Sequence, residues 1–431
     1  MKSIGLDIGT TSICAVAVEC DTGALEKTAA LDNDAALPSA NSWERTQEPG
    51  RIEQLVFDVL DQVWGEDVAS IGVTGQMHGI VYTGHGGAVS PLSTWQDGRG
   101  NLPYQDTTYA DFLGSHTGYG NVTDFYNRVN GRVPEGADAF CTIHDYIVMR
   151  LTERSVPVIH ASDAASFGCY DLLKHRFTID NKMLPAVTAQ AETVGHYRGV
   201  PVAVAIGDNQ ASFIGAGGGG DAVLVNVGTG SQVSLMADEG VLPHMAKGSL
   251  ELRPLYGDSY LLAGSALCGG RAYALLEQFF REVVYMAGGK PCGKLYEEMA
   301  RLLEEGEETD LVFTNRFCGT REDPAAHARI ANLSLTNFTP RDFIAGCLHG
   351  IADELYDLYS AAPRRCGRLL GSGNGIRRNP ALVRMFEKRF QMKMQIPSHQ
   401  EEAAVGAALF SMAAAGFYQI SELEGMIQYV L

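Results

Sequence analysis

Two short segments of the chain share one pattern of small and hydroxyl-bearing residues. The first is Asp7-Ile8-Gly9-Thr10-Thr11-Ser12, and the second, 219 positions later, is Asn226-Val227-Gly228-Thr229-Gly230-Ser231. Apolar runs flank both segments, which predicts a strand, a tight turn and a second strand in each. Glycine lets the backbone approach a ligand closely, and such a turn offers amide and hydroxyl donors together. One copy alone is typical of an ordinary hairpin, but the pair predicts two like-built domains that bind one polyphosphate.

Polar side chains also follow predicted strands. Gly75-Gln76-Met77-His78-Gly79 comes directly after the apolar run 70–74, and Gly207-Asp208-Asn209 comes directly after 200–206. In α/β proteins the ends of strands put polar groups at the sheet edge, where ligands bind. The loop Thr94-Trp95-Gln96-Asp97-Gly98-Arg99 adds an aromatic residue, an acid and a base. These segments predict a ligand site, although Gly207-Asp208-Asn209 is equally compatible with simple turn chemistry.

Regular elements are expected to position these segments. We predict helices over 48–65, 142–151, 269–286, 294–305, 338–358 and 398–414. Thr339 is a candidate N-cap with Pro340 at the first helical position, and Glu401 and Glu402 complement the dipole of the last helix. Four consecutive glycines, 217–220, hold no packed structure of their own. They predict the joint between two domains, residues 1–216 and 217–431.

Length and composition limit the class of protein. A chain of 431 residues is long enough for two domains, and its 45% hydrophobic content is that of a soluble globular protein. The net charge of -18 argues against nucleic acid or an anionic membrane as a partner. Nine scattered cysteines without a Cys-x-x-Cys pair predict reduced thiols in a cytoplasm, and the first strand begins too early for a signal peptide. The bland stretch 403–417 is too short to span a membrane and predicts a helix packed closely on a sheet.

Three patterns that resemble known ligand-binding motifs are rejected. Residues 288–294 match the start of a P-loop, but Leu295 stands where the magnesium-binding hydroxyl is needed. Gly215, Gly217 and Gly220 match a dinucleotide motif, but a strand follows instead of a helix. The three histidines His78, His144 and His160 lack metal-ligand spacing, so a zinc site is disfavoured.

The order of the motifs resembles that of FGGY carbohydrate kinases over residues 4 to 415. The resemblance rests on the two turns, on Gln76-Met77-His78-Gly79, on Gly207-Asp208-Asn209-Gln210-Ala211 and on Glu402-Ala403-Ala404-Val405-Gly406. Gln-Met-His-Gly is similar to the ketose kinases of that family. The segments 94–99, 143–146 and 164–168 look more like the sedoheptulose branch than the xylulose branch. The resemblance implies two actin-like (ribonuclease H-like) α/β domains with ATP and sugar in the cleft between them.

Two carboxylates are assigned on this basis. Asp208 is the predicted general base, because phosphoryl transfer needs one carboxylate to accept the proton of the attacking hydroxyl. Asp7 is predicted to hold Mg²⁺, usually through water, whereas a second carboxylate in place of Asn226 would repel a triphosphate. The alternative for Asp7 is a hydrogen-bonded strand acid. The phosphates are assigned to Gly9, Thr10, Thr11, Gly228, Thr229 and Gly230.

The remaining assignments concern the sugar and the adenosine. The family's substrate loop implies that Gln76, Met77 and His78 lie along the sugar. Trp95 offers an apolar plate, Asp97 and Asn209 can bond hydroxyls, and core packing is the alternative for Trp95. Gly371, Gly373 and Asn379 fall where the family binds adenosine, although Ser372 interrupts the family's triple glycine. Gly319 is a further candidate beside the base.

The expected activity is ATP- and Mg²⁺-dependent phosphorylation of the terminal primary hydroxyl of a ketose. Sedoheptulose is the first candidate and xylulose or another FGGY substrate the second. An actin-like or chaperone-type ATPase is the more distant alternative, which the Gln76–His78 loop disfavours. Expected partners are the small sugar and ATP, without nucleic acid or membrane, and a homodimer is left open.

Overall fold

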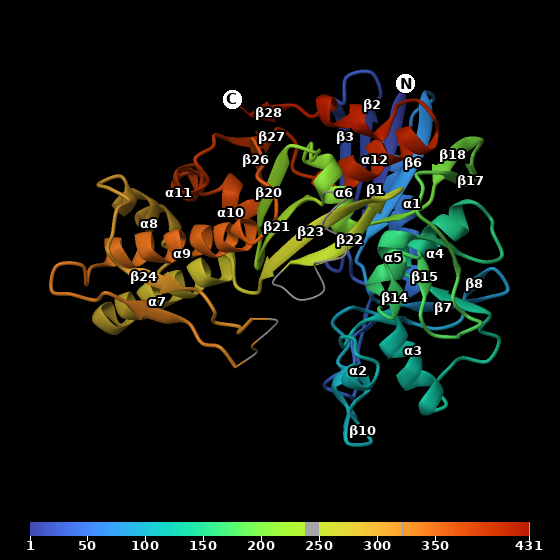
Figure 1. Ribbon diagram of the computed structural model, residues 1–431, viewed down its shortest axis with the longest axis horizontal. Coiled ribbons are helices and arrows are strands. Elements are labelled where there is room, and N and C mark those ends of the chain that lie inside the picture. Colours follow the sequence, from blue (N-terminus) through green and yellow to red (C-terminus); the bar gives the residue numbers. More distant parts are fainter. Residues whose placement is uncertain (238–249, 321–322, 324, 431) are drawn as a thin grey trace. The chain divides into compact units, whose positions relative to one another are not determined.

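The computed structural model describes residues 1–237, 250–320, 323 and 325–430 (Figure 1). The chain divides into two compact units. Unit 1 comprises residues 1–217, 253–260 and 401–428, and unit 2 comprises residues 218–252, 261–400 and 429–431. The boundary predicted at residues 216 and 217 therefore lies next to the end of the first segment of unit 1. Two later segments also belong to unit 1, which a single boundary does not describe.

The main sheet of unit 1 is built around the first predicted hairpin. Its core strands run in the order β3-β2-β1-β6-β18: β3 (Leu25–Asp32), β2 (Ser12–Glu19), β1 (Lys2–Ile8), β6 (Val68–Gly75) and β18 (Val200–Ala203). β1 pairs with β2 antiparallel and with β6 parallel, so that Asp7 lies opposite Cys14 and Thr74. The short β19 (Ile206–Gly207) also pairs with β6 and ends next to Gly75. The predicted hairpin is confirmed, and the ends of β1, β6 and β19 meet at one edge.

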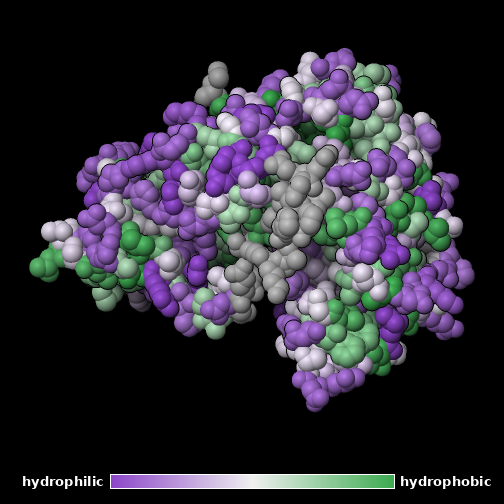
Figure 2. Space-filling view, viewed as in Figure 1, coloured by the Kyte–Doolittle hydropathy of each residue, from purple (hydrophilic) through white to green (hydrophobic). Residues whose placement is uncertain are grey.

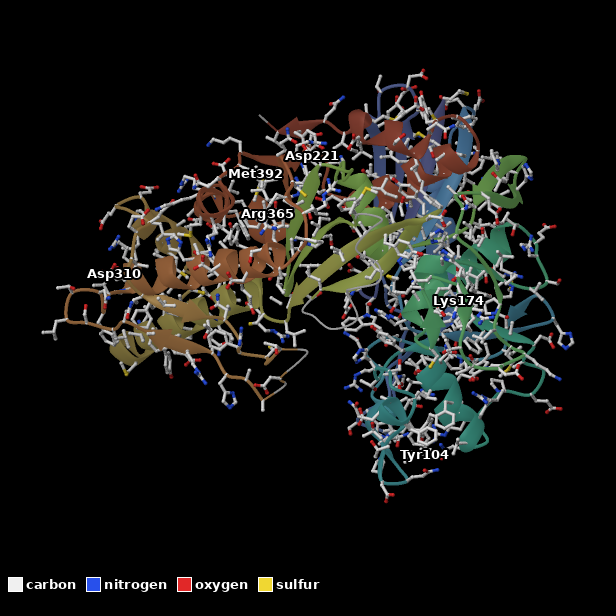
Figure 3. All side chains as sticks on the ribbon, in the orientation of Figure 1. Tyr104, Lys174, Asp221, Asp310, Arg365 and Met392 are labelled. Atoms are coloured by element: carbon white, nitrogen blue, oxygen red, sulfur yellow. The ribbon has the colours of Figure 1, made fainter. Side chains whose placement is uncertain are left out.

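The main sheet of unit 2 repeats this plan. Its core order is β23-β21-β20-β26-β27: β23 (Ser259–Ala266), β21 (Ser231–Met236), β20 (Ala222–Val227), β26 (Arg368–Ser372) and β27 (Met394–Pro397). β20 pairs with β21 antiparallel and with β26 parallel, so that Asn226 lies opposite Gln232 and Ser372. At the other end of β20, the Oδ1 atom of Asp221, labelled in Figure 3, accepts the N–H of Gly367 at 2.8 Å. The sequence repeat thus corresponds to a repeat of topology.

Unit 1 has seven α-helices in its described part. They are α1 (Pro49–Val63), α2 (Tyr109–Phe112), α3 (Gly120–Val129), α4 (Ile143–Leu151), α5 (Ala161–Ser166), α6 (Asp208–Gly215) and α12 (Glu402–Ala414). Helix α1 buries Ile52, Val56 and Val59 as its periodicity predicts. Helix α12 begins at Glu402, four residues after the predicted start, because residues 398–401 form the connection between β27 and the helix.

Glycine allows α12 to lie directly on the strands and on α6, as Figure 1 shows for α12 (red) beside β1 and β6 (blue). A Cβ atom on Gly5 of β1 would lie 1.8 Å from the carbonyl oxygen of Ala404. A Cβ atom on Gly406 would lie equally close, at 1.8 Å, to the carbonyl oxygen of Ala211 in α6. Only glycine permits such backbone contact, and the predicted close packing of this helix is confirmed.

Unit 2 has five helices in its described part: α7 (Gly270–Gly288), α8 (Tyr296–Leu303), α9 (Pro340–Ser360), α10 (Asn374–Arg377) and α11 (Pro380–Phe390). Thr339 caps α9 as predicted, since its Oγ1 atom accepts the N–H of Asp342 at 3.2 Å. Helix α7 exposes Leu275, Phe279 and Met286, and green apolar atoms interrupt the purple surface in this part of Figure 2. Within the described ranges, no helix combines the length and the apolar character needed to cross a bilayer.

The other strands are short. They are β4 (Ala36–Leu37), β5 (Thr46–Gln47), β7 (Val81–Gly84), β8 (Gly87–Ala88), β9 (Leu92–Ser93), β10 (Pro103–Tyr104), β11 (Thr107–Thr108), β12 (Ala139–Cys141), β13 (Val158–His160), β14 (Tyr170–Asp171), β15 (Arg176–Phe177), β16 (Ala186–Thr188), β17 (Thr193–Tyr197), β22 (Glu251–Tyr256), β24 (Val312–Thr314), β25 (Arg329–Ala331) and β28 (Tyr429–Val430).

Candidate active site

Asp208 is the first residue of α6, directly after β19. Gly207 is the N-cap of the helix, and its N–H donates to the Oγ atom of Ser162 at 3.0 Å. The Asp208 side chain is partly exposed. Burial raises the pKa of Asp208, while the charges of His144 and Arg253 oppose that rise. The residue therefore has the exposure and the electrostatic surroundings of a reactive carboxylate, and it begins a helix instead of a simple turn.

Asp7 lies near the end of β1, in the same electrostatic environment. Burial, followed by the charges of Asp208 and Glu401, raises the pKa of Asp7 to about 7. All three acids belong to unit 1. Carboxylates that repel one another in this way are stabilised by a cation, because a nearby positive charge favours their ionised form. Oxygen ligands of this type suit Mg²⁺.

The first turn and the Gln76 loop are joined by hydrogen bonds. Thr10 donates its hydroxyl to the Oε1 atom of Gln76 at 3.2 Å and accepts the Nε1–H of Trp95 at 3.0 Å. Gln76 also donates to Gln47 at 2.8 Å, and Gln47 donates to the carbonyl of Thr10 at 2.9 Å. The Trp95 side chain is 46% exposed, which core packing does not explain. Trp95 is therefore held in place at one edge while its ring faces solvent.

Met77 and His78 have different surroundings. Met77 is buried, and its Sδ and Cε atoms occupy the space where a Cβ atom on Gly207 would lie. His78 is partly buried, adopts a φ of 72° and stacks on Tyr119 at a ring-centroid distance of 4.3 Å. Its backbone N–H donates to Ser166 Oγ at 3.2 Å. Met77 thus supports the Asp208 turn, and His78 retains some exposed surface.

Asp97 and Asn209 both have partners within the protein. Asp97 is fully buried and accepts hydrogen bonds from Arg99 Nε at 2.6 Å and from the Arg45 N–H at 3.0 Å. A carboxylate engaged on both oxygens holds the Trp95 loop, so this geometry does not support the prediction that Asp97 bonds sugar hydroxyls. Asn209 is partly exposed and accepts from Arg253 Nη1 at 3.3 Å. Its amide nitrogen is a potential donor to a ligand.

The second turn is fixed by the beginning of α7. The N–H groups of Gly270 and Arg271 donate to the carbonyls of Gly228 and Thr229 at 2.9 and 3.0 Å. A Cβ atom on Gly270 would lie 2.5 Å from the Gly228 carbonyl oxygen. The turn keeps Thr229 exposed. Its backbone position is thus set by a helix in its own unit.

The predicted adenosine residues surround β26 and the helices that follow it. Ser372, which interrupts the family's triple glycine, accepts the Nδ2–H of Asn226 at 2.8 Å. Gly373 has a φ of 84°, and a Cβ there would lie 2.6 Å from the Val227 carbonyl oxygen. Asn379 accepts the N–H of Leu382 at 3.2 Å and so caps α11. Gly371 contacts core rather than surface, because its missing Cβ makes room for Met394.

Gly319 is buried, has a φ of 71° and lies beside a cavity in unit 2. The cavity has a volume of about 530 Å³. Arg316 and Thr320 contribute to its lining, together with side chains from β23, β24 and α9. Four of the lining residues are acidic: Glu251, Asp353, Glu354 and Asp357. Gly371, Gly373 and Asn379 do not line it, so the structure does not bring all the predicted adenosine residues to one cavity.

Sequence reasoning missed four buried polar residues of unit 1. Gln47 supports the first turn, and Ser162 supports the Asp208 turn. Asp163 lies 3.0 Å from His144, a histidine whose sequence spacing showed no partner. Asp145 lies in the same cluster. No sequence signal connects these residues, because α4 and α5 meet only in the folded protein.

Comparisons with known proteins find relatives both by sequence and by structure. No protein family model matches the chain. Sedoheptulokinase from Homo sapiens is 25% identical over 470 residues, covering 94% of this chain and 96% of that protein. Xylulose kinase from Staphylococcus epidermidis is 24% identical over 466 residues, covering 97% and 89%.

The solved structures give the fold. The structure of xylulose kinase from Rhodospirillum rubrum superposes with a TM-score of 0.83 at 21% identity, covering 100% of this chain and 93% of that one. The two-domain actin-like α/β fold implied by the sequence resemblance is therefore confirmed. This fold and the full-length relatives agree with the resemblance of the chain to FGGY carbohydrate kinases.

Proposed function

We propose that the chain transfers the γ-phosphoryl group of ATP to the terminal primary hydroxyl of a ketose. Sedoheptulose, giving the 7-phosphate, is the preferred acceptor, and xylulose, giving the 5-phosphate, is the alternative. The relative with 94% coverage of this chain that bears the name sedoheptulokinase supports this order. The observation that carries the proposal is Asp208, a partly exposed carboxylate at the start of α6 whose pKa is raised by burial.

Asp208 would act as general base. As the acceptor oxygen forms its bond to the γ-phosphorus, Asp208 takes the hydroxyl proton and ADP leaves with the electron pair of the broken P–O bond. A base with a raised pKa binds this proton more readily than an ordinary aspartate does. The same property makes Asp208 inactive in acid, where it is already protonated.

The acceptor would be oriented by unit 1. Trp95 supplies an exposed ring for the C–H face of the sugar, and its position is fixed by the bond to Thr10. His78 and Asn209 are partly exposed on the segments that flank Met77 and Asp208. The Nδ1 atom of His78 lies 2.9 Å from the Ser166 carbonyl oxygen, to which it can donate. Nε2 of that tautomer would accept a sugar hydroxyl, while the amide nitrogen of Asn209 would donate to one. Asp97 serves indirectly, by holding the loop that carries Trp95.

The nucleotide would be bound through the two turns. Gly9, Thr10 and Thr11 in unit 1 and Gly228, Thr229 and Gly230 in unit 2 offer donors to phosphates, and Gly319, Gly373 and Asn379 lie toward adenosine. Asp7 fits Mg²⁺, because its repulsion by Asp208 and Glu401 leaves local negative charge unbalanced. Bound magnesium supplies neutralisation of phosphate charge.

Sugar-dependent ADP release is the direct test. Purified protein with ATP and Mg²⁺ would be offered sedoheptulose, xylulose, ribulose and glycerol side by side. We expect the highest kcat/KM with sedoheptulose and identification of the product as the 7-phosphate. Preference for xylulose would replace the acceptor but keep the reaction. No stimulation above basal ATP hydrolysis by any acceptor would contradict the kinase and favour an actin-like ATPase.

Two further predictions concern the cellular location and the oligomeric state of the protein. A cytoplasmic location with reduced thiols stays a prediction from cysteine usage, testable by thiol titration of protein from freshly lysed cells. The homodimer stays a prediction that light scattering of the purified protein would test.

A further inference from the structure

Unit 1 contains a buried charge cluster that the proposed chemistry does not use. His144 of α4 and Asp163 of α5 are both fully buried, with Nε2 and Oδ1 3.0 Å apart. This is ion-pair distance, although neither atom makes a hydrogen bond of good geometry within the described residues. Asp145 is also buried, and its Oδ2 atom accepts the Thr142 hydroxyl at 2.6 Å. An imidazole therefore lies among carboxylates, out of contact with bulk solvent.

The cluster connects to the Asp208 turn through one hydroxyl. Ser162 precedes Asp163, and its Oγ atom lies 3.4 Å from Asp163 Oδ2 and 2.9 Å from Nδ1 of His160. The same Oγ atom accepts the N–H of Gly207, the residue before Asp208, at 3.0 Å. The cluster and the proposed base thus share a continuous set of contacts across α4, α5 and α6.

We propose that His144 and Asp163 are positioning residues for the reaction: His144 is a buried cation held by Asp163 that keeps Asp208 ionised, while Ser162 fixes the backbone from which Asp208 projects. This inference rests on the proposed function, because it gives Asp208 its role as base. The residues act through Asp208 and not on the substrate.

The charges around His144 support this assignment. Burial alone would lower the pKa of His144, but Asp163, followed by Asp145 and Asp208, raises that pKa to about 9. Burial, followed by the charge of Asp163, raises the pKa of Asp145 well above its usual range, while the charge of His144 and the hydrogen bonds from Thr142 oppose the rise. Among the described residues, the charged groups that act on His144 or Asp208 are Asp7, Asp145, Asp163 and Arg253, with Glu401 acting on Asp7. Cys141 and His160 interact with Asp163 instead.

His160 provides a natural contrast. It is as buried as His144 and caps α5, where its Nδ1 atom accepts the Ser162 N–H at 3.2 Å. Its Nε2 atom lies 3.3 Å from the Ala189 carbonyl oxygen, to which it can donate. Burial lowers the pKa of His160 to about 4. Two buried histidines packed on one helix therefore differ in charge.

A bound divalent cation is the competing explanation. The Nδ1 atom of His144 and the Oδ1 atom of Asp145 have no hydrogen-bond partner among the described residues, and one ligand atom from each of His144, Asp145 and Asp163 could surround an ion. Either a protonated His144 or a divalent cation bound by a neutral His144 would balance the charge of Asp163. Metal analysis decides between the two. A stoichiometric metal that persists in Asp7→Asn and is lost in Asp145→Asn would overturn our proposal.

The first experiment measures charge directly. In the wild-type protein labelled with ¹⁵N-histidine, we expect one imidazole to stay doubly protonated from pH 5 to 8 and to be absent from His144→Gln. We expect a second imidazole, absent from His160→Gln, to stay neutral over that range. A neutral His144 at pH 7 would overturn the proposal. This measurement uses the wild-type fold and needs no turnover.

The second experiment measures the pH profile of kcat/KM at saturating Mg²⁺, so that Asp7 stays ionised. Loss of the cation should move the acid limb upward by about one pH unit in His144→Gln and in Asp163→Asn. Activity should return to within about threefold of wild type at pH 9, where Asp208 is ionised in every variant. In His160→Gln the acid limb of the kcat/KM profile should not shift along the pH axis. An equal loss at every pH would indicate a merely structural role and would overturn the proposal.

The proposed function can be contradicted without contradicting this inference. If no acceptor is phosphorylated by the wild type, the kinase is contradicted. The carboxyl ¹³C titration of Asp208, compared between wild type and His144→Gln, then decides the inference without turnover. An unchanged Asp208 titration would overturn it.

Discussion

The two hairpins of this chain share one backbone plan and differ in charge. In unit 1, Asp7 on β1 pairs across to Cys14 and Thr74, and its pKa is raised by burial, Asp208 and Glu401. In unit 2, Asn226 occupies the matching place on β20 and donates to Ser372 at 2.8 Å. The first hairpin is electrostatically unsatisfied without a cation, whereas the second is satisfied by a neutral hydrogen bond.

This difference shows how two units with the same strand order can have different roles. Both sheets use the same strand order, so the turns reach equivalent positions in the two units. At the two turns, carboxylate repulsion acts in unit 1, where the charge of Asp208 raises the pKa of Asp7, whereas Asn226 of unit 2 is uncharged. Because repulsion between buried carboxylates lowers stability, it persists only where function uses it. The following experiments change the charged and polar groups of the two units, and they are ordered by the size of the expected effect.

Removing the base should give the largest effect. Asp208→Asn should lower kcat by about 10³-fold, the scale of general-base catalysis, because the amide cannot take the hydroxyl proton. ATP affinity, measured by calorimetry, should change little. Asp106→Asn, in the exposed turn between β10 and β11, is the matched control and should retain wild-type turnover. Normal turnover in Asp208→Asn would remove it from the mechanism.

Replacing Asp7 by an uncharged residue, as in the second hairpin, should weaken the use of Mg²⁺. Asp7→Asn should lower kcat/KM by about 10- to 100-fold at limiting Mg²⁺, because an amide is a weaker ligand for a hard cation than a carboxylate. The Mg²⁺ concentration needed for half-maximal rate should rise. An unchanged Mg²⁺ requirement would assign Asp7 to a structural role instead.

The same substitution should alter stability in the absence of Mg²⁺. The pKa of Asp7 is about 7 in the folded protein and near 3.8 when unfolded, so the folded state retains a proton that the unfolded state has released between these values. The free energy of unfolding should therefore fall as pH rises from about 4 to 7, by about 2–3 kcal/mol after allowance for partial exposure. Asp7→Asn should remove this slope. Urea denaturation at pH 4.5 and pH 8 checks it, and identical slopes would exclude Asp7 as the cause.

Charging the second hairpin should have the smallest effect. Asn226→Asp keeps a partner for the Ser372 hydroxyl but adds a carboxylate beside the phosphates, so ATP should bind about tenfold more weakly at limiting Mg²⁺. Ser372→Ala is the control, because it removes the hydrogen bond without adding charge. It should cost about 1 kcal/mol of unfolding free energy. Equal ATP affinities in the two variants would mean that charge at this place is unimportant.

Much of this arrangement could be predicted from local sequence. Tight turns depend on neighbouring residues, which is why both hairpins and the helix cap at Thr339 are confirmed. The polar segments after β6 and β19 were also located correctly, since a strand's end is visible as a change of hydrophobicity. The start of α12 was misplaced, because residues 398–401 form a connection after β27 that helical periodicity does not reveal.

Side-chain partners were less predictable. Asp97 was expected to bind hydroxyls, yet it pairs with Arg99 and with the Arg45 amide. Ser372 was an unexplained departure until its bond to Asn226 gave it a reason. The contacts of Asp97 with Arg45 and of Asn226 with Ser372 join separate segments of the chain, and the spacing of residues along a sequence carries no record of such distances.

By itself, the sequence determined the repeated turns, the strand ends that carry Gln76 and Asp208, and the Asp7/Asn226 difference, because each depends on short-range patterns. Only tertiary structure decided that α12 packs on the first sheet, where Gly5 and Gly406 admit its backbone. It also decided that His144, without a recognisable partner in the sequence, lies 3.0 Å from Asp163. Charge and close packing act through space, so only the folded chain reveals which groups they join.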